Sequence, residues 1–442
     1  MSVPDIPAKK LSLWQVVLIG IAYMTPMVVF DTFGLVSEAT NGRVPLAYLL
    51  ALFAMLLTAF SYARFSAISD KPGSAYTYTA ESCGQSLGFF VGWCALLDYM
   101  LLPLVNALLV GIYAEALIPN VPAWLWIVIT VSFVTIINSF RISFLANLSL
   151  LFVVAPVILM VVFIYLVISG ISTTQGAEYV LTMKPLFNGD SNVITLIAGA
   201  SILCFSFLGF DAVTTLSSET ENPKKTIPRA VLLITLIGGV IFFTASWFIQ
   251  LYFPTNVQFK EPSAALPEIV LYVGGVLFQS IFLTGQIMNT LASGLASHAS
   301  ASRLIYIMGR DGIFSKFFGE IHQKLGTPLY AVLFVGLISL IAVFLDLAQV
   351  VSLISFGALI AFTSVNFSVF MQFYVKEKQD KGFKNIFMNA ILPLISVLVI
   401  MVLWFNLESS SLIFGSQWLA IGIMFFIYKK MRKQSIVIND AC

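Results

Sequence analysis

The chain has 442 residues, of which 59% are apolar and 10% are charged, with a formal net charge of +2 at pH 7. Soluble domains carry about 25% charged residues, so this composition excludes a soluble enzyme, a disordered chain and a nucleic-acid-binding protein. No polar block is long enough to be the soluble head of a single-span receptor. The small net charge indicates no class of partner.

Apolar runs separated by Gly, Pro, Asn and charged residues predict an all-α polytopic membrane protein with 12 transmembrane helices. Each span needs about 20 apolar residues. In chain order, the predicted spans lie near residues 11–35, 44–66, 87–113, 121–140, 142–170, 193–217, 227–253, 266–298, 328–346, 348–374, 388–406 and 410–428.

The basic residues predict the orientation of these spans. With 12 spans, both ends of the chain share one side of the membrane, and of the 23 Lys and Arg residues only Arg43, Lys184 and Lys260 fall on the other side. Because Lys and Arg are retained on the cytoplasmic side, we expect both termini to be cytoplasmic.

Helix-breaking residues interrupt the first and the sixth predicted spans at similar depths. The first contains Thr25-Pro26-Met27, and the sixth contains Gly209 within the stretch 205–210. Unwound backbone at membrane depth is tolerated where it is buried in protein or lines a cavity, and paired interruptions point to a transporter site between two inverted repeats. An ordinary proline kink and a packing glycine are the alternative interpretation.

Three acidic residues lie inside predicted spans that have no basic residue in their interior: Asp31, Asp98 and Asp211. An ionised carboxylate in mid-membrane costs about 2.5–3.5 kcal/mol on insertion scales, which marks each as a candidate functional group. Asp98 is the strongest candidate to bind a substrate ammonium group or a proton, unless it is protonated and bonded to a neighbouring helix. Asp211 either neutralises a second amine or braces its helix. Asp31 either attracts an incoming cation or is a solvated vestibule acid.

Several motifs resemble the amino acid–polyamine–organocation transporter family. They are PGSAYTY at 72–78, GFFVGW at 88–93, FSFLGFD at 205–211, ETENPKKTIPR at 219–229, and the segment 302–312 followed by Thr327-Pro328. Further segments resemble the bacterial putrescine importers of that family: TPM at 25–27, FDTFG at 30–34, LDY at 97–99, GFDAVTTL at 209–216 and NTLASGLASHAS at 289–300.

The resemblance implies a leucine-transporter-type core of five plus five helices, with the first and sixth helices broken. The first repeat would cover 11–170 and the second 193–374, followed by two extra helices in 388–428, with cytoplasmic tails 1–10 and 429–442. It also implies alternating access around a site between helices 1, 3, 6, 8 and 10, in a bacterial cytoplasmic (inner) membrane.

Two departures from the family pattern bear on the substrate and the ion. Amino-acid-transporting members usually have a Gly-Ser-Gly type break that holds the substrate carboxylate, where this chain has Thr25-Pro26-Met27. Since proline has no N–H to donate, an amine without a carboxylate is favoured. Some proton-coupled relatives carry a lysine in helix 5, where this chain has only apolar residues and Ser149 in 148–154.

Two sets of candidate site residues result from these arguments. The expected substrate-binding residues are Asp98, Tyr99, Tyr23, Met24, Thr25, Pro26, Phe205, Phe207, Leu208, Gly209, Phe210 and Asp211. The expected vestibule or ion-coupling residues are Asp31, Glu219, Ser293, Ser297 and His298. Aromatic rings offer cation–π faces to an ammonium group, with Phe207 preferred, although packing is the alternative for each ring.

The other candidates also have two interpretations each. Tyr99 is expected to point to a different side of its helix from Asp98, unless a bend turns it. His298, placed near the cytoplasmic end of its span, either relays a proton or has a structural role. Ser293, Ser297 and Ser300 would help to ligate sodium. Glu219 begins a polar loop that either gates the inner side or only sets topology.

The predicted function is secondary import of putrescine or a related diamine, with H+ favoured over Na+ as the coupling ion. A neutral or cationic amino acid symporter or exchanger is the alternative within the family. A channel is disfavoured because no charged ring or filter repeat is evident. The histidines at 298 and 322 form no H-E-x-x-H motif, and the four cysteines show no C-x-x-C spacing, so we predict no enzyme activity, metal site or cofactor.

Overall fold

The computed structural model describes residues 10–68, 74–140, 145–187, 192–254, 259–310 and 312–431. Within these ranges every named element is a helix, and the one strand-like pairing is an isolated bridge between Leu11 and Thr220. Most of the predicted tails, the Pro72-Gly73 part of one motif, the first residues of the span predicted at 142–170, and Cys442 lie outside the described residues.

The α-helices are α1 (Leu13–Met24), α2 (Val28–Thr40), α3 (Val44–Ile68), α4 (Ala75–Cys83), α5 (Gln85–Leu117), α6 (Ala123–Ser139), α7 (Leu145–Thr174), α8 (Lys184–Phe187), α9 (Val193–Leu203), α10 (Pro223–Tyr252), α11 (Ala265–Arg310), α12 (Leu329–Ser339), α13 (Leu347–Val369), α14 (Phe383–Ile386), α15 (Leu392–Phe405) and α16 (Ser409–Met431). Two short 3-10 helices, η2 (Cys204–Phe207) and η3 (Ala212–Glu219), follow α9.

The described helices include 9 that are long and apolar enough to cross a membrane, or 10 if α1 and α2 form one bent span. Two shorter apolar helices, Ala123–Ser139 and Leu329–Phe344, occupy the positions of the fourth and ninth predicted spans. The all-helical membrane class predicted from composition is therefore confirmed.

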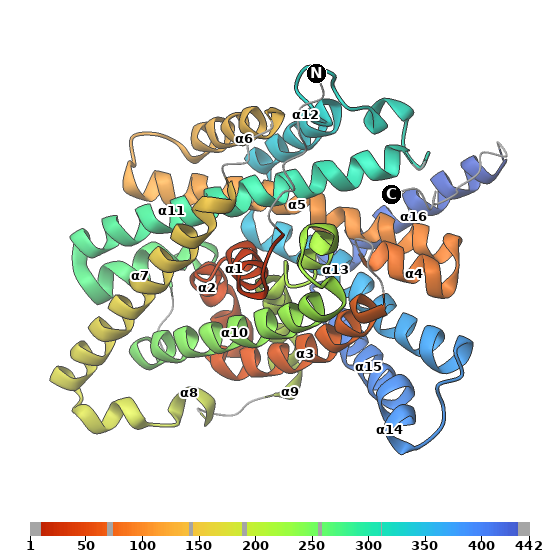
Figure 1. The fold of residues 1–442 in the computed structure, drawn as a ribbon. Helices are drawn as coiled ribbons and strands as arrows, with labels where there is room; N and C mark the ends of the chain where they lie inside the picture. Colours follow the sequence, from red (N-terminus) through yellow and green to blue (C-terminus); the bar gives the residue numbers. More distant parts are fainter. Residues whose placement is uncertain are drawn as a thin grey trace.

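Helices differ strongly in how much of their surface other helices cover. In the most apolar stretch of α5, 78% of the residues are buried, whereas in α16 the share is 17%. Figure 1 shows α1 and α2 near the middle of the bundle, with α3 and α10 along one side and α11 along the other. The outer helices expose large apolar side chains such as Val161, Leu337 and Met424, a surface that suits lipid rather than water.

Helix α11 extends beyond the span predicted at 266–298. It continues twelve residues further, to Arg310. Residues 299–308 contain no Gly or Pro that would end the helix. The positive charge of Arg310 in the last turn also interacts favourably with the negative end of the helix dipole. The helix is also interrupted near its start at Gly275, where φ is 74°.

Helix α13 packs unusually closely on α5 at Gly357. A Cβ atom at this position would lie 2.5 Å from the carbonyl oxygen of Cys94 and 3.1 Å from the Cβ of Leu97. The absence of a side chain is therefore what lets α13 approach the turn of α5 that carries Asp98.

We predict that Gly357→Ala lowers stability by about 1–3 kcal/mol, the usual cost of overpacking. Gly294→Ala is the matched control, because a Cβ there would meet its nearest neighbour at an ordinary 3.4 Å. Thermal unfolding of the detergent-solubilised variants measures both. Equal melting temperatures for the two variants would show that the contact at Gly357 is not limiting.

Candidate functional site

The first helix interruption lies between α1 and α2, whose axes are bent by 45°. Thr25 has φ 50° and ψ 98°, outside the helical region, and Pro26 has no N–H with which to continue the helix. The Val28 N–H bonds to the Thr25 carbonyl at 2.9 Å and so starts a new helix. Where the end of α1 meets the start of α2, the terminal backbone C=O and N–H groups are therefore not all paired within a helix.

The second interruption follows α9, where the backbone passes through η2 and a turn at 208–211 before η3. Gly209 in this turn has φ 108°, a conformation that favours glycine. A Cβ at Gly209 would also enter the ring of Tyr23. The glycine thus lets the two interrupted segments touch.

A tyrosine on α3 joins the same two segments by hydrogen bonds. The Tyr48 hydroxyl lies 3.1 Å from the Thr32 hydroxyl of α2 and 3.1 Å from the Ser206 hydroxyl of η2. All three residues are buried, so this chain of hydroxyl groups fixes α2 against η2 inside the bundle.

Asp98 of α5 is buried beside these interruptions. It is 6% exposed, and its Oδ1 atom has no hydrogen-bond partner. Asp211 is close enough to interact with it electrostatically. Among the described residues, no basic side chain interacts with either acid. A buried polar atom without a partner carries a desolvation cost, which a cationic ligand would relieve.

Asp211 lies in the turn after Gly209 and is half-buried. The Tyr62 hydroxyl of α3 donates a hydrogen bond to its Oδ2 at 3.4 Å, and the backbone N–H groups of Gly209 and Ala212 also bond to its carboxylate. Asp211 therefore has structural partners in addition to its proximity to Asp98.

Two tyrosines complete the group around the acids. Tyr23 of α1 interacts electrostatically with both carboxylates, and its hydroxyl lies near Ser300 of α11. Tyr99, the next residue of α5, interacts electrostatically with Asp98, Asp211 and Tyr23. Pro103 stands inside α5 one turn further on, where a proline bends a helix.

Other predicted substrate-binding side chains are engaged in packing. Met24 lies against Gly238 of α10. The Phe207 ring is 5.4 Å from the Phe242 ring in an edge-on arrangement, and the Phe210 ring is 5.6 Å from that of Tyr62. Phe205, Leu208 and Pro26 are likewise buried, and Thr25 is partly buried.

Asp31 lies in α2, away from a solvated surface. It is 5% exposed, its Oδ1 accepts a hydrogen bond from Gln286 Nε2 at 2.7 Å, and it accepts a second from the Tyr113 hydroxyl. The two donors come from α11 and α5. This burial does not match a solvated vestibule acid.

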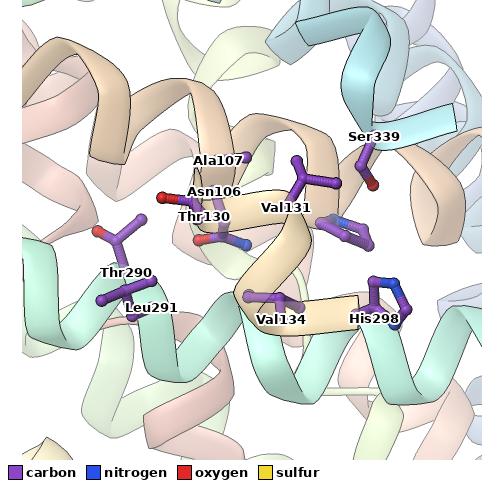
Figure 2. A pocket seen from close by; sticks show the side chains of 11 residues that line it. Asn106, Ala107, Thr130, Val131, Val134, Thr290, Leu291, His298 and Ser339 are labelled. Carbon is purple, nitrogen blue, oxygen red and sulfur yellow. The ribbon is translucent and has the colours of Figure 1, made fainter. Parts of the chain in front are cut away.

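His298 is buried in the body of α11, not near the end of that helix. Its Nε2 lies 3.4 Å from the Thr135 hydroxyl of α6, and its Nδ1 has no partner. Figure 2 shows His298 with Asn106, Thr290 and Ser339 around a small cavity between α5, α6, α11 and α12. The cavity has room for about one water molecule.

The remaining ion-coupling candidates are not gathered at one point. Ser297 donates a hydrogen bond to the Gly294 carbonyl of its own helix at 3.3 Å, and Ser293 is buried on the same helix. Glu219 is exposed, and its backbone carbonyl accepts the Leu11 N–H at 2.8 Å. The Glu221 N–H bonds back to the Leu11 carbonyl at 2.9 Å, which ties the start of α1 to the end of η3.

Sequence reasoning considered Ser300 only as a sodium ligand and missed Tyr62, Tyr113 and Gln286. Each is a polar side chain in a helix that is otherwise apolar, which is the one signal that would have identified them. Which acid each of them faces depends on helix packing and is not encoded in spacing along the chain.

The amino acid permease family model matches residues 15–438. The chain is 47% identical to the low-affinity putrescine importer PlaP of Escherichia coli K12 over 418 residues, which cover 94% of this chain and 92% of that protein. It is 23% identical to the branched-chain amino acid permease BcaP of Bacillus subtilis, over 96% and 93% of the two chains. Its identity to cationic amino acid transporter 4 of Mus musculus is 26%, over 81% of this chain and 59% of the mouse protein. The chain is a multi-pass membrane protein that belongs to the amino acid permease family, as its motifs predicted.

Proposed function

We propose that this protein imports putrescine or a related small diamine across the bacterial inner membrane as a secondary active transporter. One observation carries the proposal: Asp98 and Asp211 interact inside an apolar bundle where two interrupted helical segments meet, and no basic side chain of the described ranges interacts with either acid. The 47% identity to a putrescine importer supports the same substrate class.

The proposed architecture is the one inferred from the motifs. Twelve spans result if α1 with α2 forms one span and the short helices α6 and α12 also cross the membrane. The repeats 11–170 and 193–374 would then each begin with an interrupted helix, with 388–428 forming the two extra spans and both termini cytoplasmic. Alternating access would proceed by movement of the interrupted helices against the rest of the bundle.

In the proposed binding mode, one ammonium group pairs with the unpartnered Oδ1 of Asp98. The second ammonium group reaches Asp211, and the rings of Tyr23 and Tyr99 contact the alkyl chain and the charges between the two acids. A short diamine suits this arrangement because it supplies two cations and no anion.

The alternative is an amino acid symporter or exchanger. The similarity to the amino acid transporters, at 23–26% identity, favours it. A substrate carboxylate needs free N–H groups, however, and Pro26 removes one of them at the first interruption. We propose coupling to H+ in preference to Na+, since the Ser297 hydroxyl oxygen, a candidate sodium ligand, already accepts a hydrogen bond from Asn106 Nδ2 at 3.5 Å.

Reconstitution in liposomes tests the transport function directly. We expect saturable uptake of labelled putrescine that follows an imposed pH gradient in sodium-free medium. Unlabelled diamines should compete better than any amino acid. An amino acid that outcompetes putrescine, or uptake that requires sodium, would instead support the alternative.

Asp98→Asn should weaken putrescine binding by about 10- to 100-fold, because a hydrogen bond to a charged group contributes about 1.5–3 kcal/mol. Glu115→Gln is the matched control, since Glu115 lies on the same helix but is exposed. Competition binding to purified protein gives both affinities. Unchanged affinity in Asp98→Asn would remove this residue from the site.

Asp211→Asn should weaken binding of putrescine more than binding of the monoamine butylamine, because only the diamine presents a second charge. Tyr62→Phe serves as the control, since it removes the hydrogen bond to Asp211 and keeps the carboxylate. If Asp211→Asn weakens both amines equally, Asp211 braces the turn and does not bind the second amine.

A further inference from the structure

Asp31 forms a second buried acidic site, distinct from the one at Asp98. It lies on α2, beyond the first interruption, and both of its hydrogen bonds converge on Oδ1: one from Gln286 Nε2 at 2.7 Å and one from the Tyr113 hydroxyl. The donors belong to α11 and α5, so this carboxylate is a point at which α2 is tied to two long neighbouring helices.

Among the residues that the structure describes, no cationic group interacts with Asp31. The titratable groups that interact with it are Tyr113 of α5 and Tyr48 of α3. Three other elements that pack on α2 carry no charged residue. Helix α9 and η4 (Pro262–Ala264) contain no ionisable residue, and the one ionisable residue of η2 is the buried Cys204. Along α10 no charged residue lies between Arg229 and the C-terminal end, and along α11 none lies between Glu268 and His298.

A carboxylate that is buried among neutral groups at membrane depth must bind a cation or a proton to become neutral. The geometry at Asp31 suits a proton. Oδ1 is already occupied by two donors, so a proton adds to the other carboxylate oxygen, Oδ2, and both existing hydrogen bonds are retained. No bond other than O–H forms or breaks in this step.

The site is also connected to the substrate region. Thr32, the next residue of α2, belongs to the hydroxyl chain through Tyr48 to Ser206 of η2, and η2 leads directly into the turn that holds Gly209 and Asp211. A change in how Asp31 binds its two donors would therefore reach the second interruption through α2 and this chain.

We propose that Asp31 binds the proton that is co-transported with the substrate, with Tyr113 and Gln286 as positioning residues. The inference rests on the proposed function, which it deepens by naming the coupling group. It predicts that substrate exchange and proton coupling are separable by mutation.

The test is Asp31→Asn, which keeps an oxygen for both donors and permanently resembles the protonated acid. In proteoliposomes we expect this variant to retain exchange of external labelled putrescine for internal unlabelled putrescine. It should lose the accumulation driven by an acidic exterior, together with the proton influx reported by a trapped pH-sensitive dye. Glu38→Gln, an exposed acid on the same helix, should retain exchange, accumulation and proton influx.

Tyr113→Phe is the second variant and keeps the acid in place. Loss of one donor to the ionised carboxylate makes proton binding easier, so the pH at which accumulation is half-maximal should move upward while exchange persists. Proton-coupled accumulation in Asp31→Asn, or an unchanged pH profile in Tyr113→Phe, would overturn the inference. Absence of putrescine exchange in the wild type would instead contradict the proposed function itself.

Discussion

The structure depends on one constraint: inside an apolar bundle, every interrupted backbone and every carboxylate must find its partners within the protein. Two helical segments are interrupted here, and they meet where the absence of a side chain at Gly209 admits the ring of Tyr23. Asp31 and Asp98 satisfy this constraint to different degrees. Asp31 has two donors, whereas Asp98 keeps an unpartnered oxygen beside Asp211. The incomplete site is the one that needs a ligand.

Helix α5 connects the two acidic sites. It carries Asp98 and Tyr99 at one level and Tyr113 at another, and it is among the most buried helices of the bundle. A long buried helix holds side chains more rigidly than a loop does, because its neighbours fix both its axis and its rotation. The interrupted segments contribute Tyr23, Asp211 and Asp31. The proposed substrate site and the proposed proton site are thus each formed between a continuous helix and an interrupted one.

The interrupted segments are themselves joined at two levels. At one end, Leu11 exchanges backbone hydrogen bonds with Glu219 and Glu221, and deeper in the bundle Tyr48 bridges α2 and η2. Most of these contacts are hydrogen bonds between groups far apart in sequence. Such hydrogen bonds favour a joint movement of the two segments over independent movement, which is consistent with the alternating access proposed above.

The sequence by itself determined the membrane class, the family, the positions of the apolar helices and the presence of three acids among apolar segments, because hydropathy and motif residues are local properties of the chain. Only the tertiary structure decided which groups face which acid. Asp31 accepts hydrogen bonds from residues of α5 and α11, and His298 lies within a helix that continues to Arg310. These outcomes depend on how each helix is rotated and bent against its neighbours. When a helix is apolar on all sides, its sequence indicates this rotation only weakly. The hydrogen bonds that define the two acidic sites join residues up to 255 positions apart, and no local pattern records that distance.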